Sequence, residues 1–315
     1  MSLITINSKP VYYTLNPASS SSSPSSLTLL FLHGLGSTSS FYAPIIPLLS
    51  SAGHACLTLD THGSGLSSYT GAGNSITSIA ADALGLLDAL AITENVVVVG
   101  HSMGGIVASH LAATAPSLIR AVVLIGPVNP NPGAADVFSK RIAVVERDGM
   151  GPLAATIPTA ATGSQSPSKS PTRSYRESPL KAAKDKLSSI LKTSKGLFAS
   201  SAAASADAMA STLSPPPGRM TYQASLLGSD PAGYVSLCRA IAEAAVPAYA
   251  DVRAPLLVLA GEEDKSAPLE GLEAIMEGCG STKKEMRILK GVGHWHVLEA
   301  WEEVGEIIAG FLKGV

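Results

Sequence analysis

Short apolar runs recur along the chain, and each is bounded by glycine, proline or polar residues. Four of these runs are rich in branched aliphatic side chains, at residues 27–32, 96–99, 121–125 and 256–260. Runs of this length and composition are typical of strands that are buried on both faces of a parallel sheet. The pattern therefore predicts a mostly parallel sheet that contains these four strands.

Between and after these runs, the apolar positions follow the spacing of amphipathic helices. Residues 76–90 and 301–311 each place their apolar side chains on one helical face, and residues 105–112 continue in helical spacing. Near the start of the chain, residues 4–6 and 11–15 are joined by a turn-forming stretch and resemble a β-hairpin. Strands that alternate with helices in this way predict an α/β protein with a doubly wound sheet.

The alternation stops between residues 129 and 224, where prolines punctuate a sequence rich in alanine and serine. We therefore predict a core made of residues 1–128 and 225–315, into which residues 129–224 are inserted as a helical, partly irregular lid. Within it, we predict a low-complexity, flexible segment at about residues 158–219. Residues 165–195 carry eight basic side chains against two acidic ones. A solvated segment explains this excess most simply, and attraction to an acidic substrate or macromolecule is the alternative.

Composition limits the classes of function. The 315 residues are 46% hydrophobic and only 15% charged, and the formal net charge of −2 gives no reason to expect a nucleic acid or a membrane as partner. The three cysteines contain no Cys-x-x-Cys pair, which predicts reduced, structural thiols. No histidines, cysteines or carboxylates have metal-ligand spacing, so we expect neither metal nor cofactor.

Localisation and assembly are less constrained. The sequence opens without a basic stretch followed by an apolar one, and no apolar run approaches the roughly 20 residues that span a bilayer. We therefore expect a soluble, cytoplasmic protein, and the sequence leaves its oligomeric state open.

The pentapeptide at residues 100–104, Gly-His-Ser-Met-Gly, directly follows the buried run of four valines. Its serine lies between two glycines, each two residues away, at a predicted sharp turn from a strand into a helix. This arrangement is called a nucleophile elbow. Since a serine hydroxyl is a weak nucleophile, Ser102 needs a base and an acid that orients the base. Asp264 follows the run at residues 256–260, and His294 follows residues 286–289, which we also predict to form a short strand. Ligands bind where such strands end. Asp264 and His294 are the acid and the base that we predict.

Neighbouring residues compete for some of these roles. Glu262 and Glu263 are adjacent carboxylates that could replace Asp264 as the acid, and His296 is the competitor for the base. We assign His296 instead, together with His101 and Trp295, to the substrate-binding candidates.

Further motifs carry a resemblance to a known family. His33-Gly34 follows the first buried run, residues 60–67 read Asp-Thr-His-Gly-Ser-Gly-Leu-Ser, and serine, aspartate and histidine occur in the order of the α/β-hydrolase superfamily. The chain resembles that superfamily outside the middle insertion, which implies the α/β-hydrolase fold. The resemblance also implies that the backbone N–H groups of Leu35 and Met103 form the oxyanion hole. Residues 226–234, 238–240 and 293–299 are similar to 3-oxoadipate enol-lactonase-like hydrolases.

The function implied by the resemblance is hydrolysis of a small carboxylic ester or lactone, including an enol-lactone, through an acyl-enzyme. Two alternatives use the same residues. One is non-hydrolytic chemistry of the hydroxynitrile lyase or cofactor-free haloperoxidase type, and the other is a ligand-binding receptor that retains the triad. The sequence does not identify the substrate.

Overall fold

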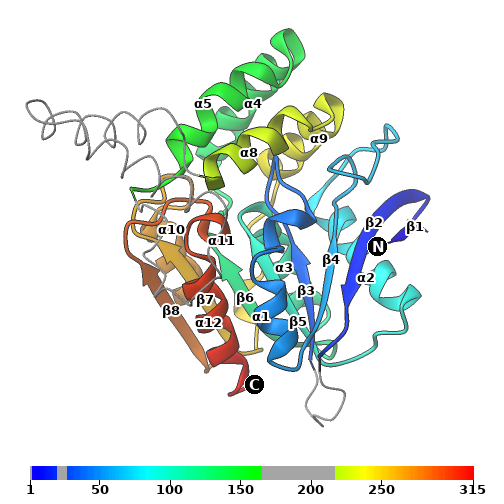
Figure 1. Ribbon diagram of the computed structural model, residues 1–315, viewed down its shortest axis with the longest axis vertical. Helices are drawn as coiled ribbons and strands as arrows, with labels where there is room; N and C mark the ends of the chain where they lie inside the picture. Colours follow the sequence, from blue (N-terminus) through cyan, green and yellow to red (C-terminus); the bar gives the residue numbers. More distant parts are fainter. Residues whose placement is uncertain (1, 20–26, 165–216) are drawn as a thin grey trace, which may run out of the picture. The chain divides into compact units, whose positions relative to one another are not determined.

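The computed structural model describes residues 2–19, 27–164 and 217–315. The basic stretch at 165–195 and most of the low-complexity segment lie outside these residues. In the part described, eight strands form one sheet in the order β1-β2-β4-β3-β5-β6-β7-β8 (Figure 1). The strands are β1 (Ser2–Ile6), β2 (Lys9–Asn16), β3 (Thr28–Leu32), β4 (Ala55–Leu59), β5 (Val96–His101), β6 (Ile119–Ile125), β7 (Leu256–Gly261) and β8 (Lys284–Leu289).

The sheet is parallel from β4 to β8 and antiparallel at its N-terminal edge. The predicted hairpin is confirmed, because β1 pairs with β2 across a turn in which Asn7 and Ser8 have φ angles of 49° and 63°. Positive φ at both turn residues matches the twist of the two strands. The four predicted buried runs are confirmed as β3, β5, β6 and β7, whereas β4 was not predicted.

Helices cover both faces of the sheet, as expected for a doubly wound protein. In Figure 1, α1 and α12 lie in front of the sheet and contact each other, while α2 and α3 lie behind it. Ser75 caps α2 through a reciprocal pair of hydrogen bonds with Ser78. The helices of these layers are α1 (Ile46–Ser51), α2 (Ile76–Ala89), α3 (Met103–Thr114), α10 (Leu269–Gly278), α11 (His296–Glu299) and α12 (Trp301–Leu312), with short 3-10 turns η1 (Ser39–Tyr42) and η2 (Tyr249–Asp251).

A helical region is inserted between β6 and β7, on the side where the parallel strands end (Figure 1). It contains α4 (Pro132–Asp148), α5 (Gly151–Ala161), α8 (Pro217–Leu227) and α9 (Pro231–Ala242), and α4 packs against both α5 and α9. The boundary that we propose at residue 225 falls within α8. None of the helices that the structure describes is long and apolar enough to cross a membrane.

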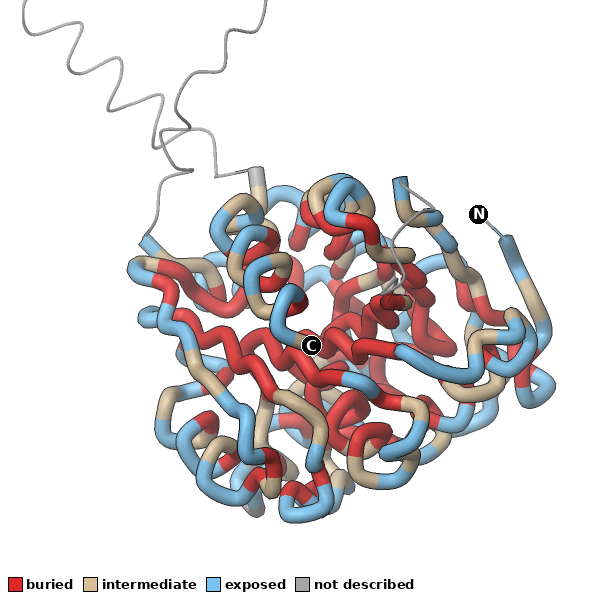
Figure 2. The backbone as a smooth tube through the Cα atoms, turned by 90° about the horizontal axis from the view of Figure 1, so that it is seen from below, coloured by how far each residue is buried: buried red, intermediate tan, exposed pale blue. Residues whose placement is uncertain are grey.

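The core is continuous from the sheet to both helical layers, as the buried central strands in Figure 2 show. All residues of β5 and β7 are buried, so both faces of these strands are covered. Cys56, Cys238 and Cys279 are also buried and form no disulfide. Burial raises the pKa of the Cys56 and Cys238 thiols to about 12, which keeps these two groups protonated and unreactive.

Candidate active site

Ser102 occupies the turn between β5 and α3, where its φ of 52° and ψ of −117° are unusual for a residue with a side chain. The two flanking glycines make this turn sterically allowed. A Cβ at Gly100 would lie 2.2 Å from the carbonyl oxygen of Gly104, and a Cβ at Gly104 would lie 2.0 Å from that of Leu32. The strand and the helix therefore approach closely only because both positions lack side chains.

Asp264 follows β7, and its side chain lies within hydrogen-bond distance of the imidazole of His294. Its Oδ2 is 2.8 Å from Nδ1 of His294. Its Oδ1 accepts hydrogen bonds from the backbone N–H groups of Ser266 and Ala267, at 2.8 and 2.9 Å. Burial, the largest single effect, raises the pKa of this carboxyl. The charge and the hydrogen bond of His294, together with weaker contributions, lower the pKa by more than burial raises it, so the net shift is downward. Asp264 is therefore held as a carboxylate against the imidazole.

The adjacent glutamates bind elsewhere. Glu262 accepts a hydrogen bond from the backbone N–H of Gly291 at 2.9 Å. Glu263 accepts from the backbone N–H of Ser164 at 2.9 Å and from the hydroxyl of the same serine. In the described contacts, neither glutamate reaches His294. Of the three neighbouring carboxylates, the structure brings Asp264 to the histidine.

The backbone of His294 is held from two sides. Its N–H donates to the carbonyl oxygen of Ala161, at the end of α5, at 2.7 Å. Its own carbonyl oxygen lies 2.8 Å from Nε2 of His101 and 2.9 Å from Nδ1 of His296. Burial lowers the pKa of both imidazoles, well below the usual value for His101 and to about 4 for His296. Both rings are therefore neutral, and each donates its single N–H to this carbonyl.

Glu299 was not predicted from the sequence, yet it organises the same loop. Its Oε2 accepts the N–H groups of Gly163 and Gly293 at 2.7 and 2.9 Å, and its Oε1 accepts that of Trp295 at 2.9 Å. Burial raises the pKa of this carboxyl, and the three N–H donors oppose that shift. Glu299 thus ties the residues on both sides of His294 to the chain that leaves α5.

The predicted oxyanion-hole residues flank the elbow. Met103 is the first residue of α3, so its N–H has no acceptor within the helix. Leu35 lines the pocket described below. The loop that carries it is fixed by His33, whose Nε2 accepts from the N–H of Thr61 at 3.0 Å and whose Nδ1 donates to the carbonyl of Gly34 at 2.8 Å. The same loop also packs closely against the elbow, because a Cβ at Gly34 would lie 3.0 Å from the Cβ of Ser102.

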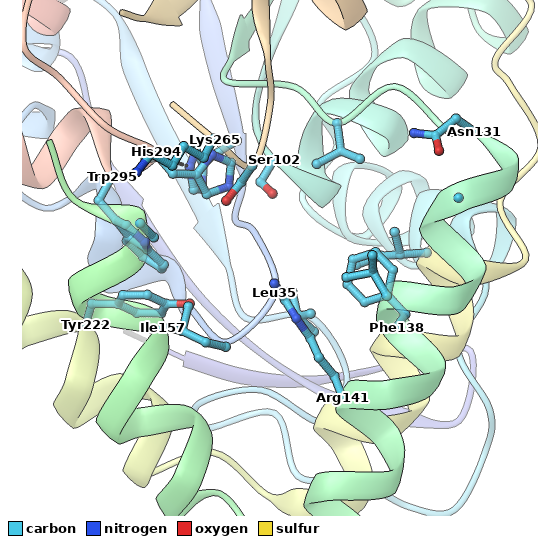
Figure 3. Close-up of a pocket in the computed structure, with 17 residues that line it drawn as sticks. Leu35, Ser102, Asn131, Phe138, Arg141, Ile157, Tyr222, Lys265, His294 and Trp295 are labelled. Atoms are coloured by element: carbon cyan, nitrogen blue, oxygen red, sulfur yellow. Dashed lines mark hydrogen bonds between the residues drawn. The ribbon is translucent and has the colours of Figure 1, made fainter. Parts of the chain in front are cut away.

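A cavity of about 440 Å³ lies under the inserted helices, and Figure 3 shows Ser102 and His294 together in its wall. Two of the proposed substrate-binding residues, His101 and Trp295, also line it. His296 does not. Its side chain is fully buried, and its Nε2 lies 4.0 Å from Oδ2 of Asp264. It therefore packs beneath the acid rather than in the pocket.

The sequence analysis did not identify the other side chains that form this wall. The apolar ones come mainly from the inserted helices, and two cations, Arg141 and Lys265, join them. Among the described residues, no three histidines, cysteines or carboxylates lie close enough together to hold a metal ion. The wall presents the hydroxyl of Ser102 and the imidazole of His294, and the carboxylate of Asp264 lies behind that imidazole.

The family model described as "Alpha/beta hydrolase family" matches residues 29–307, which include the sheet from β3 to β8, the elbow and the histidine loop. The chain belongs to the alpha/beta hydrolase family. Solved structures agree with this assignment at the level of the fold. The enol-lactonase from Burkholderia xenovorans LB400 superposes with a TM-score of 0.73 at 20% identity, over 99% of this chain and all of that one. A thermophilic esterase from Thermogutta terrifontis gives 0.75 at 18% identity, over 99% and 98%.

Curated relatives match a shorter region. A protein of Variovorax paradoxus (strain S110), named as the carbamate hydrolase RutD, is 35% identical over 128 residues. A 2-(acetamidomethylene)succinate hydrolase of Mesorhizobium japonicum is 35% identical over 112 residues. These matches cover 40% and 36% of this chain and 47% and 38% of the relatives. This chain thus spans about half the length, or less, of these two curated relatives.

Proposed function

We propose that this hydrolase cleaves a small carboxylic ester or lactone through an acyl-enzyme, with Ser102 as nucleophile, His294 as base and Asp264 as the acid that orients the base. The observation that carries the proposal is the geometry of the three residues. Ser102 is held at positive φ on the elbow, and His294 shares its pocket and lies 2.8 Å from the buried carboxylate of Asp264. The structural similarity to an enol-lactonase and an esterase supports the same reaction class.

In the first half of the reaction, the hydroxyl oxygen of Ser102 attacks the substrate carbonyl carbon while Nε2 of His294 takes the hydroxyl proton. Asp264 holds Nδ1 protonated, which leaves Nε2 free to accept, and it stabilises the imidazolium that forms. The N–H groups of Leu35 and Met103 bind the oxyanion, and each such donor contributes roughly 3 kcal/mol in the transition state. The carbon–oxygen bond to the alcohol then breaks, and the alcohol oxygen takes the proton from His294.

In the second half, water attacks the acyl-serine ester and passes a proton to His294. The ester bond to Ser102 breaks, its oxygen recovers that proton, and the carboxylic acid is released. With a lactone, the alcohol and the acid stay in one product molecule. No cofactor enters either half of this reaction.

Labelling with a fluorophosphonate tests the nucleophile. We expect the full-length protein to react with the probe in a ratio of one per chain, and peptide mass spectrometry to place the adduct on Ser102. Ser102→Ala should lose both labelling and ester hydrolysis. Ser266→Ala is a matched control, because Ser266 lines the same pocket and contributes only its backbone N–H to Asp264. It should keep both.

Substrate screening then separates the alternatives. Hydrolysis of 4-nitrophenyl or lactone substrates, with an acyl adduct on Ser102 during turnover, is the expected result. Labelling of Ser102 without turnover of any ester, thioester or lactone would overturn the proposal in favour of non-hydrolytic chemistry or ligand binding.

A further inference from the structure

The charges in the wall of the pocket are of one sign. Arg141 and Lys265 both line the cavity, and no carboxylate is among the described residues that form its wall. The acid of the proposed triad lies behind the base, since the side chain of Asp264 is fully buried. The cavity is therefore positive toward a ligand, and apolar neighbours such as Ile157 and Ile241 strengthen this field by excluding water.

Arg141 is held by its surroundings. It extends from α4 into the pocket on the side of Leu35 (Figure 3), and its side chain is half-buried. Its guanidinium carbon lies 5.2 Å from the centre of the Phe138 ring, a cation–π contact. Its charge and a side-chain hydrogen bond also act on the buried hydroxyl of Tyr234, so part of the donor set of the guanidinium already has a neutral partner. In the described part of the chain, no ion pair joins Arg141 to a carboxylate, so the planar donor face of this cation has no acidic partner.

The two cations differ in position. Lys265 follows Asp264 directly and lies beside His294 and Ser102, whereas Arg141 lies across the pocket from them (Figure 3). In the proposed reaction, His294 gives a proton to the leaving alcohol, so the alcohol part of the substrate lies on the side of His294 and Lys265. The acyl part then extends away from His294, toward Arg141.

We infer that the pocket selects esters or lactones whose acyl part carries a carboxylate, and that Arg141 binds this carboxylate. The inference rests on the proposed hydrolase function and specifies its substrate class. A guanidinium binds a carboxylate through two parallel hydrogen bonds, which fixes orientation as well as charge. Lys265 adds attraction at the reacting end without a fixed geometry. Specificity for the acyl chain thus resides on α4, in the inserted helices, rather than in the triad.

Matched substrate pairs test this inference. The 4-nitrophenyl monoesters of glutarate and adipate carry the terminal carboxylate at two distances, and the 4-nitrophenyl esters of 5-methylhexanoate and 6-methylheptanoate replace it with an isopropyl group of similar shape. The spontaneous hydrolysis of each ester is measured and subtracted. We expect the wild-type kcat/KM to be at least about tenfold higher for the anionic member of one pair, the order of one charge-assisted hydrogen bond.

Variants then assign the preference to a residue. Arg141→Gln should reduce the ratio between anionic and neutral esters to near one, mainly by raising KM for the anionic ester, and should leave the neutral ester almost unchanged. Rates with the neutral ester also show that the variant is folded. Lys140→Gln is the matched control, because Lys140 is an exposed cation next to Arg141 on α4 and does not line the pocket. It should keep the wild-type ratio.

Each result has one consequence. If the wild type hydrolyses the neutral esters at least as well as both anionic ones, or if Arg141→Gln keeps the preference, the inference is wrong and the hydrolase function stands. If the wild type hydrolyses none of the four esters but cleaves another ester or a lactone of the screen above, the inference is wrong and the hydrolase function stands. If it cleaves no ester, thioester or lactone at all, the proposed function itself fails, and the inference fails with it.

Discussion

Replacing Asp264 with asparagine changes the site without changing its shape. The expected effect follows from how the two carboxylate oxygens are used. Oδ1 accepts two backbone N–H groups, from Ser266 and Ala267, and Oδ2 faces Nδ1 of His294. An asparagine keeps one acceptor, and two fixed donors require that acceptor at the Oδ1 position. Its NH2 group then points at His294.

This orientation reverses the tautomer of the base. Because the asparagine NH2 is a donor, Nδ1 of His294 has to accept, and the ring proton moves to Nε2. A ring protonated at Nε2 cannot take the proton of Ser102, and the imidazolium also loses its counter-charge. The equivalent change in serine proteases lowers kcat about 10⁴-fold, which corresponds to about 5 kcal/mol in the activation barrier. We expect a loss of this order for Asp264→Asn.

The assay is steady-state hydrolysis of a 4-nitrophenyl ester at pH 7, with the active-site concentration determined by fluorophosphonate titration of the wild type. Glu262→Gln and Glu263→Gln provide matched controls, because they make the same chemical change one and two residues away, in carboxylates that bind other partners. Both should stay within about threefold of the wild type. A folded Asp264→Asn protein within tenfold of the wild-type kcat would refute the assigned role and the tautomer argument.

Three further predictions concern the support of the site and of the sheet. Glu299→Gln turns one acceptor into a donor, so one of three backbone N–H groups loses its partner. The melting temperature should fall by a few degrees, and kcat measured well below that temperature should fall about tenfold; an unchanged kcat would contradict the positioning role. Lys9→Met leaves Asp82 buried without its ion-pair partner at 2.7 Å, so the free energy of unfolding in urea should fall by about 3–5 kcal/mol. Adding Asp82→Asn should restore most of this loss, and a double variant in which the two losses add would count against this reasoning. In the folded protein, burial lowers the pKa of His296 from the ordinary 6.5 to about 4. Between these two pH values the unfolded chain binds more protons than the folded one. The free energy of unfolding should therefore fall by about 3 kcal/mol as the pH falls through this interval. His296→Asn should show a shallower loss over the same interval, and an equal slope would show that other groups cause it.

The proposed triad could be predicted from the sequence because it depends on strand ends. Ser102, Asp264 and His294 follow β5, β7 and β8, and parallel strands bring their carboxyl ends to one edge. The prediction needs only the strands and the order of the residues along the chain. The same rule did not distinguish Asp264 from its two neighbouring glutamates, since a difference of one residue in a loop decides the direction of a side chain. The resemblance to α/β-hydrolases favoured Asp264, and the coordinates add its contact with Nδ1 of His294.

In the sequence analysis, one strand was missed and the role of several prolines was misjudged. β4 was missed, although Ala-Cys-Leu-Thr-Leu is no shorter than β3 and, like β3, contains one threonine. In the structure Thr58 is buried, and its hydroxyl lies 2.8 Å from that of Thr14 on β2. Prolines were interpreted as interruptions of structure between residues 129 and 224. The four inserted helices that the structure describes all begin at a proline or one residue before it, and the first turn of a helix needs no N–H at that position. Among the prolines of these four helices, Pro158 alone lies beyond the first turn.

The residues that escaped prediction, Glu299 and Arg141, belong to contacts between elements that are distant in sequence, and they divide the inserted region into two roles. The end of α5 is bound to the histidine loop through Ala161, Gly163 and Glu299, so it is part of the machinery that positions His294. α4 makes no such contact with that loop in the described bonds, and it contributes a cation to the far side of the pocket. Changes on α4 should therefore alter which ester is accepted, and changes at the end of α5 should alter how fast any ester is cleaved. The proposal thus assigns selection and catalysis to chain segments that precede and follow one short turn, at Gly149 and Met150.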